Sequence, residues 1–123
     1  MNIQFPSLEG VKLAEFQLQE VCKTTPLEPN KRLSEMTGAL VFLKREDLQQ
    51  IRSFKIRGAY NKIASLSEAA REKGIVCASA GNHAQGFAFA CNQLKIHGRV
   101  YMPATTPQQK TAQVKRFGGN FVE

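Results

Sequence analysis

Apolar side chains recur along this chain at steps of three or four residues, a spacing typical of amphipathic helices. The spacing predicts a first helix from Glu9 to Val21. Further helices are predicted from Lys55 onward and over 67–73, 83–95 and 107–117. The chain is therefore expected to be rich in helices, most of them in its second half.

Short apolar runs bounded by turn residues lie between these helices and predict strands. Two runs span 75–79 and 99–102, and residues 120–123 resemble the opening of a third strand. Strand–helix–strand units of this length join parallel strands through right-handed crossovers. The order of elements therefore predicts an α/β fold with a parallel sheet.

Turn and cap residues complete the predicted layout. In the first half, Leu33–Glu35 and Leu40–Lys44 are predicted to pair as strands across a turn around Gly38. In the second half, Thr106 is predicted to cap the last helix, with Pro107 at the first helical position.

Lys55 lies where a predicted helix begins, which is an unusual place for a cation. Ser53 offers a hydroxyl that can accept a hydrogen bond from the start of that helix. Exposed amide N–H groups and the positive end of the helix dipole disfavour an ammonium ion there. A neutral amine is the nucleophile that imine formation with a carbonyl compound requires. Lys55 is thus a candidate Schiff-base lysine, and the alternative is one more solvated lysine.

A second candidate site, Ser79–Gly86, follows a predicted strand and opens the next helix. Such a loop lies at the carboxyl edge of a parallel sheet, where unpaired helix amides attract an anion. Gly81 lets the backbone approach a ligand, and Ser79 and Asn82 supply a hydroxyl and an amide. The alternative is an ordinary turn capped by Asn82. A P-loop is excluded because Phe87 stands where its lysine belongs.

Several motifs occur in the order expected of a known family. They are Thr24–Leu27, Leu43–Gln49, Ser53–Ala59, Ser79–Gly86, Met102–Pro103 and the segment Thr106–Lys110. Together they resemble the threonine dehydratase (threonine ammonia-lyase) family of fold-type II pyridoxal phosphate enzymes, and Leu43–Gln49 and Ser53–Ala59 look closest to its biosynthetic form. The resemblance implies a partial tryptophan synthase beta-like fold. Residues 1–52 would belong to the large domain, and residues 53–123 would start the small α/β subdomain.

The resemblance also implies which residues bind the cofactor and the substrate. Lys55 would hold pyridoxal 5'-phosphate covalently, Phe54 would pack beside the pyridine ring, and Asn82 would hydrogen-bond the phenolic oxygen of the cofactor. The loop residues would receive the substrate carboxylate: Ser79, Ala80, Gly81, Asn82 and His83. Arg57 and Gln85 have no implied role, and Arg57 is expected to be a surface charge.

The reaction implied by the resemblance is β-elimination of L-threonine to 2-oxobutanoate and ammonia, a step of isoleucine biosynthesis. Freed Lys55 would act as the general base on the Cα proton. Serine racemases and serine dehydratases share much of the motif set, so L-serine is an alternative substrate. A further alternative is an inert α/β fragment whose loop binds a small anion.

The glycine-rich loop with which the family holds the cofactor phosphate has no match in this sequence. The chain is therefore expected to be an amino-terminal fragment with little activity alone, taken from an enzyme that forms homo-oligomers. Its 123 residues, 42% hydrophobic and 22% charged, fit part of one globular enzyme.

Charge and composition limit the classes of molecule that the chain is expected to bind. The net charge of +7 is uneven, because residues 51–123 hold 11 basic and 3 acidic groups, whereas residues 1–50 hold 6 basic and 7 acidic groups. This excess could attract a phosphorylated cofactor, whereas its dispersed pattern disfavours nucleic-acid binding. No apolar stretch has the length of a membrane span or the form of a signal peptide, so a cytoplasmic enzyme is expected.

Cysteine and histidine positions give no sign of a metal or redox site. Cys22, Cys77 and Cys91 lack metal-ligand or redox spacing, which predicts reduced structural thiols. His83 and His97 form no ligand cluster, so no metal is expected.

Overall fold

The computed structural model describes residues 5–118 and 120–122. The elements, in order, are α1 (Leu8–Leu18), β1 (Leu27–Pro29), α2 (Lys31–Thr37), β2 (Phe42–Lys44), the 3-10 helix η1 (Glu46–Leu48), α3 (Lys55–Ala64), α4 (Glu68–Glu72), β3 (Ile75–Ala78), α5 (Asn82–Leu94), β4 (Gly98–Tyr101), α6 (Gln108–Arg116) and β5 (Asn120–Val122). The helices and strands predicted after residue 54 are confirmed. The first helix is also confirmed, although it ends at Leu18 rather than Val21.

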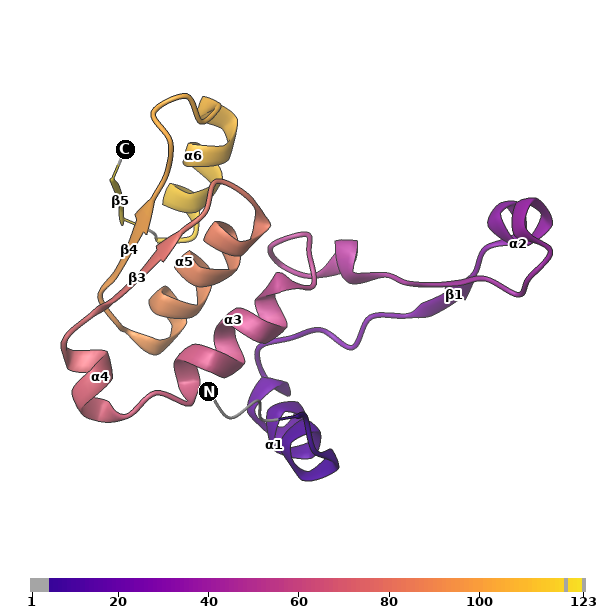
Figure 1. Ribbon diagram of the computed structural model, residues 1–123, viewed down its shortest axis with the longest axis horizontal. Helices are drawn as coiled ribbons and strands as arrows, with labels where there is room; N and C mark the ends of the chain where they lie inside the picture. Colours follow the sequence, from indigo (N-terminus) through magenta and orange to yellow (C-terminus); the bar gives the residue numbers. More distant parts are fainter. Residues whose placement is uncertain (1–4, 119, 123) are drawn as a thin grey trace.

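Strands β3, β4 and β5 form a parallel sheet in that order, with Ile75 opposite Gly98 and Arg99 opposite Asn120. This confirms the predicted α/β class. In Figure 1, α5 and α6 lie beside the sheet and α3 lies next to α5. The main core fills the space between these helices and the sheet and contains Ile63, Ala84, Phe87, Ala88, Ala90, Cys91, Val100, Met102 and Val114.

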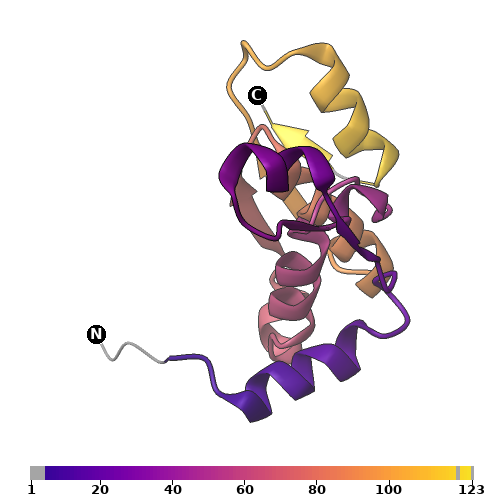
Figure 2. The same ribbon diagram turned by 90° about the vertical axis from the view of Figure 1, so that its right-hand side faces the viewer.

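Residues 27–44, which include β1, α2 and β2, form an arm that projects from this α/β body (Figure 1). Strands β1 and β2 pair antiparallel within the arm, with Leu27 opposite Lys44, and every residue of both strands is exposed. In Figure 2, α1 runs across one end of α3, and the two helices are in contact. Only Leu18 of α1 is buried.

The predicted hairpin is wrong in one of its two strands. Residues 33–35 belong to helix α2, and the partner of β2 is β1. The Asn30 side chain accepts a hydrogen bond from the Leu33 amide at 2.9 Å, which caps α2. Gly38, at φ 68°, ends the helix in the left-handed conformation that glycine adopts readily. The turn residues around Gly38 therefore end a helix instead of joining two strands.

The predicted cap of α6 is also wrong. Pro107 occupies the cap position, and the Thr106 hydroxyl donates to the Pro103 carbonyl at 2.6 Å. The Thr106 hydroxyl is thus directed to the loop, and no side chain caps the first turn of α6. Elsewhere, the Ser67 side chain caps α4, and Gly74 follows this helix at φ 77°.

Candidate functional site

Lys55 is the first residue of α3, as predicted. The buried Ser53 hydroxyl accepts the Lys55 amide hydrogen at 3.1 Å, although Phe54 occupies the formal cap position. The Lys55 side chain is exposed, and its Nζ lies 5.2 Å from the centre of the Phe54 ring, within cation–π range. Phe54 is itself 61% exposed. The structure therefore presents a lysine amine and an aromatic face side by side at a helix start.

Gly86 sets how closely the backbone of Lys55 approaches α5. A Cβ atom at Gly86 would lie 3.0 Å from the Lys55 carbonyl oxygen and 3.3 Å from Ala59 Cβ. Gly86 follows Asn82, the first residue of α5, by one helical turn, a rise of about 6 Å. The backbone of Lys55 therefore lies one turn away from the helix start that the candidate loop leads into.

The loop between β3 and α5 has the form that the sequence predicts. The Ser79 amide donates to the Tyr101 carbonyl at 3.1 Å, and the Gly81 amide donates to the Ser79 hydroxyl at 3.3 Å. The structure does not form the alternative, a turn capped by Asn82, because Gly81 takes the cap position and no side chain bonds to the first turn. Among the described residues, the exposed Asn82 side chain has no hydrogen-bond partner. First-turn amides without a side-chain cap can bind an anion.

The five predicted loop residues do not face a single hollow. Asn82 and Gln85 line a polar hollow of about 440 Å³ together with Arg52 and Arg116. His83 lines a separate, apolar hollow of about 240 Å³ between α3 and β3. Lys55 lies outside both hollows. Asn82 and Lys55 therefore do not line a common hollow among those formed by the described residues.

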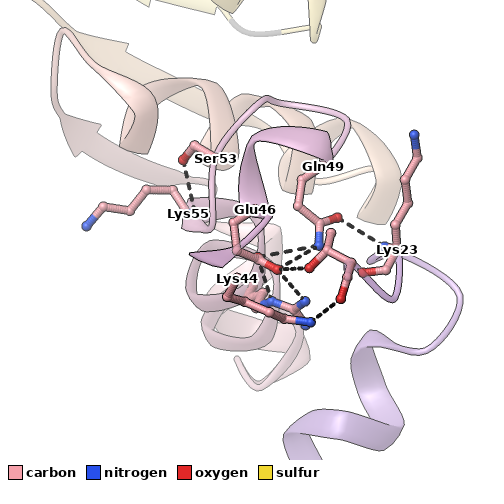
Figure 3. Close-up of polar contacts among 8 residues, drawn as sticks. Lys23, Lys44, Glu46, Gln49, Ser53 and Lys55 are labelled. Atoms are coloured by element: carbon pink, nitrogen blue, oxygen red, sulfur yellow. Dashed lines mark hydrogen bonds and ion pairs between the residues drawn. The ribbon is translucent and has the colours of Figure 1, made fainter. Parts of the chain in front are cut away.

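Behind Lys55 lies a polar cluster centred on Glu46 (Figure 3). Arg57 binds Glu46 through two contacts, Nε to Oε2 and Nη2 to Oε1, each at 2.8 Å. The buried Thr25 hydroxyl donates to Glu46 Oε1 at 2.6 Å, and Gln49 Nε2 lies 3.4 Å from both carboxylate oxygens. The Arg57 hydrogen bond in particular lowers the pKa of Glu46 to about 2. Glu46 is therefore an anion throughout the physiological range.

Arg57 is not the simple surface charge that the sequence suggested. Its side chain is 36% exposed, and the Glu46 side chain that it grips is only 14% exposed. Sequence analysis missed Glu46 as the partner of Arg57, and it missed Thr25 and Gln49 as partners of Glu46. The only available signal was the motif Leu43–Gln49, and nothing in its pattern shows which side chain Arg57 reaches.

The low pKa of Glu46 predicts how stability depends on pH. A carboxyl group whose pKa is depressed on folding stabilises the protein fully above its ordinary value, here 4.5. That contribution is lost as the pH falls from 4.5 toward 2. With allowance for solvent screening, we expect Glu46→Gln to cost about 1 kcal/mol at pH 7. The difference from wild type is expected to shrink at pH 2.5.

Urea unfolding at the two pH values measures this difference in the free energy of unfolding. Asp47→Asn is the control, because Asp47 is exposed and pairs with Arg45 rather than Arg57. It is expected to change stability by less than about 0.5 kcal/mol. An equal deficit for Glu46→Gln at both pH values would contradict the linkage to this carboxyl group.

The three cysteines lie partly or fully buried. All three thiols are free, and burial raises the pKa of Cys77 to about 11 and that of Cys91 to about 12. Burial also raises the pKa of Cys22. Across residues 5–118 and 120–122, no group of His, Cys, Asp and Glu side chains has metal-binding geometry. The same residues contain no helix that is both long and apolar enough to cross a bilayer.

The described residues thus combine a parallel sheet edge, a helix start without a side-chain cap and a lysine at a neighbouring helix start in one α/β unit. The family described as pyridoxal-phosphate dependent enzyme matches residues 18–123 of the sequence. The chain belongs to this family.

Two curated relatives carry the same enzyme name. The biosynthetic L-threonine dehydratase of Mycobacterium tuberculosis is 53% identical over 119 residues, which cover 95% of this chain and 28% of the relative. The enzyme of the same name from Bacillus subtilis is 54% identical over 110 residues, covering 89% of this chain and 26% of the relative. The chain thus spans a little over a quarter of the length of these relatives.

Solved structures share the fold. Threonine deaminase isoform 2 from tomato, in its processed form, superposes with a TM-score of 0.79 at 38% identity, covering 95% of this chain and 34% of that one. Maize serine racemase superposes with a TM-score of 0.86 at 31% identity, covering 94% and 35%. These matches confirm the predicted resemblance to fold-type II enzymes.

Proposed function

We propose that this chain supplies the lysine-bearing part of a pyridoxal phosphate enzyme that converts L-threonine to 2-oxobutanoate and ammonia. The main support is the placement of Lys55 at the start of α3, where its backbone packs closely against α5 at Gly86. This contact puts its backbone one turn from the start of α5. The names of the relatives point to the same reaction.

The residues of this edge fit pyridoxal phosphate. Lys55 provides an exposed amine for the cofactor aldehyde, and the exposed Phe54 ring offers an apolar face for the pyridine ring. The Asn82 amide, without a partner among the described residues, is available for the phenolic oxygen. When bound, the cofactor supplies an electron sink for charge at Cα.

The substrate would be held by the loop and deprotonated by the lysine. The backbone amides of Ser79–His83 would bind the carboxylate, as expected of helix-start amides that no side chain caps. Lys55 Nζ would take the Cα proton. Loss of the β-hydroxyl follows from that proton transfer.

The remaining proposals concern the whole enzyme. A division at residues 52 and 53 is supported by the start of the α/β body at α3, after the projecting arm. We propose a homo-oligomer in the cytoplasm whose reaction feeds isoleucine synthesis, in keeping with the biosynthetic names of the relatives.

Substrate choice tests the proposal. The enzyme that contains this chain, with pyridoxal phosphate bound, is supplied with L-threonine or L-serine, and 2-oxobutanoate, pyruvate, D-serine and ammonia are measured. One methyl group separates the two substrates, so kcat/KM is expected to favour threonine by about 10- to 200-fold. A preference for serine, or formation of D-serine, would instead favour the activity in the name of the maize neighbour.

A further inference from the structure

We propose that the Glu46–Arg57 ion pair is a positioning device for Lys55, fixing the rotation of α3 about its axis so that the amine leaves the helix in one direction. The inference rests on the proposed function of Lys55 as the cofactor-binding amine. The inference assigns to Arg57 a positioning role that neither its place in the sequence nor its exposure suggests.

The first observation is the geometry of the pair. Arg57 lies two residues after Lys55 in the first turn of α3. With 3.6 residues per turn, the two side chains leave the helix about 200° apart. In Figure 3 the Lys55 side chain accordingly extends away from Glu46. A two-point contact at Arg57 therefore fixes the flank of α3 opposite Lys55.

The second observation is that Glu46 is itself anchored on the side away from α3. Thr25 and Gln49 both hydrogen-bond its carboxylate. Gln49, 1% exposed, accepts from the Lys23 amide at 3.0 Å and donates to the Lys23 carbonyl at 2.9 Å. Lys44 Nζ donates to the Thr25 carbonyl at 2.5 Å. The carboxylate that holds Arg57 is thus tied to residues 23–25, directly through Thr25 and indirectly through Gln49.

The third observation is that the buried residues of α3, Ile56, Ala59 and Ile63, are all apolar. Ile56, fully buried, packs with Ile51 and Phe89, but such contacts have no preferred direction. A lysine Nζ lies on the order of 8 Å from its helix axis, so a rotation of about 20° moves it by about 3 Å. A bidentate arginine–carboxylate pair resists such a rotation because both of its contacts require one geometry.

The chain contains a matched control for this pair. Arg45 also binds carboxylates, those of Glu28 at 2.6 Å and Asp47 at 2.8 Å, and none of the three is part of α3. Removing the Arg45 pairs therefore removes comparable salt bridges without freeing the lysine helix.

The test measures where pyridoxal phosphate attaches. The full chain is incubated with pyridoxal phosphate across a range of pH, reduced with borohydride and digested, and labelling of Lys55 is compared with labelling of Lys62 in the same helix. Arg57→Gln and Glu46→Gln are expected to lower the Lys55 to Lys62 ratio about tenfold and to shift the pH at which half of Lys55 reacts. Arg45→Gln is expected to leave both unchanged.

Two further variants keep the test decisive. If Arg57→Gln loses helical circular dichroism, Arg57→Lys replaces it, since lysine keeps the charge but not the two-point contact. Exchange of the partners, Glu46→Arg with Arg57→Glu, is expected to restore part of the labelling ratio.

Each outcome separates this inference from the proposed function. In one outcome, wild-type protein is labelled selectively at Lys55, and the Arg57 and Glu46 variants lose thermal stability but keep the wild-type Lys55 to Lys62 labelling ratio and the wild-type pH of half-reaction. That outcome would show that the ion pair is only structural. Wild-type protein that labels its lysines evenly would overturn the proposed function and, with it, this inference.

Discussion

Replacing Lys55 by alanine is expected to abolish threonine turnover in the enzyme that contains this chain, with a loss of about 10³-fold or more in kcat. The change removes both the amine that would hold the cofactor and the base that would take the Cα proton. The measurement is formation of 2-oxobutanoate from L-threonine with added pyridoxal phosphate.

Lys62→Ala is the matched control, because Lys62 is an exposed lysine in the same helix, two turns further on. It is expected to leave kcat within about twofold of wild type. Turnover by Lys55→Ala close to the wild-type rate would refute the assignment of Lys55 as the cofactor-binding lysine and base, even if the wild-type protein were labelled selectively at Lys55.

The second large effect is expected at Gly86. Alanine gains about 1 kcal/mol over glycine inside a helix. Here its Cβ would lie 3.0 Å from the Lys55 carbonyl oxygen and 3.2 Å from the carbonyl carbon, both backbone atoms. Overpacking of this kind costs about 1–3 kcal/mol, so we expect a net loss of stability of about 1 kcal/mol. Covalent labelling of Lys55 is expected to fall about tenfold, because the backbone of Lys55 must shift.

Gly58→Ala supplies the comparison within the same pair of helices. A Cβ atom at Gly58 would meet nothing within 4 Å, so the helix-propensity gain stands alone, about 0.5–1 kcal/mol. Urea unfolding and borohydride labelling of both variants measure the contrast. If Gly86→Ala were as stable as Gly58→Ala and labelled Lys55 normally, the close approach of α3 to α5 would not position the lysine.

Local sequence signals were sufficient to locate the helices and strands of the second half of the chain, although they did not identify the cap of α6. Around Lys55 and Ser79–Gly86, helical spacing, strand runs and glycine positions all lie within one element or its flanking turn, so periodicity locates them. Gly74 ends α4 as expected, and β3 follows it at once. These predictions depend on neighbours in sequence, which a single sequence displays.

Predicting the structure of the first half required information from residues farther along the chain. The segment Leu33–Glu35 suits either a strand or a short helix, and the Asn30 cap and the pairing of β2 with Leu27–Pro29 decided between them. In the same way, Arg57 meets Glu46 only because η1 turns the chain back toward α3. The contact at Gly86 depends on how two helices cross, and sequence periodicity does not encode that crossing.

The central claim is that the fold makes one amine chemically distinct by placing it at this edge. The chain contains ten lysines, so the most direct measurement is the site of a single pyridoxal phosphate label, fixed by borohydride and mapped by mass spectrometry of peptides. The account predicts that one peptide, the one containing Lys55, holds nearly all of the label at low cofactor concentration. Label spread over many lysines in proportion to their exposure would contradict it.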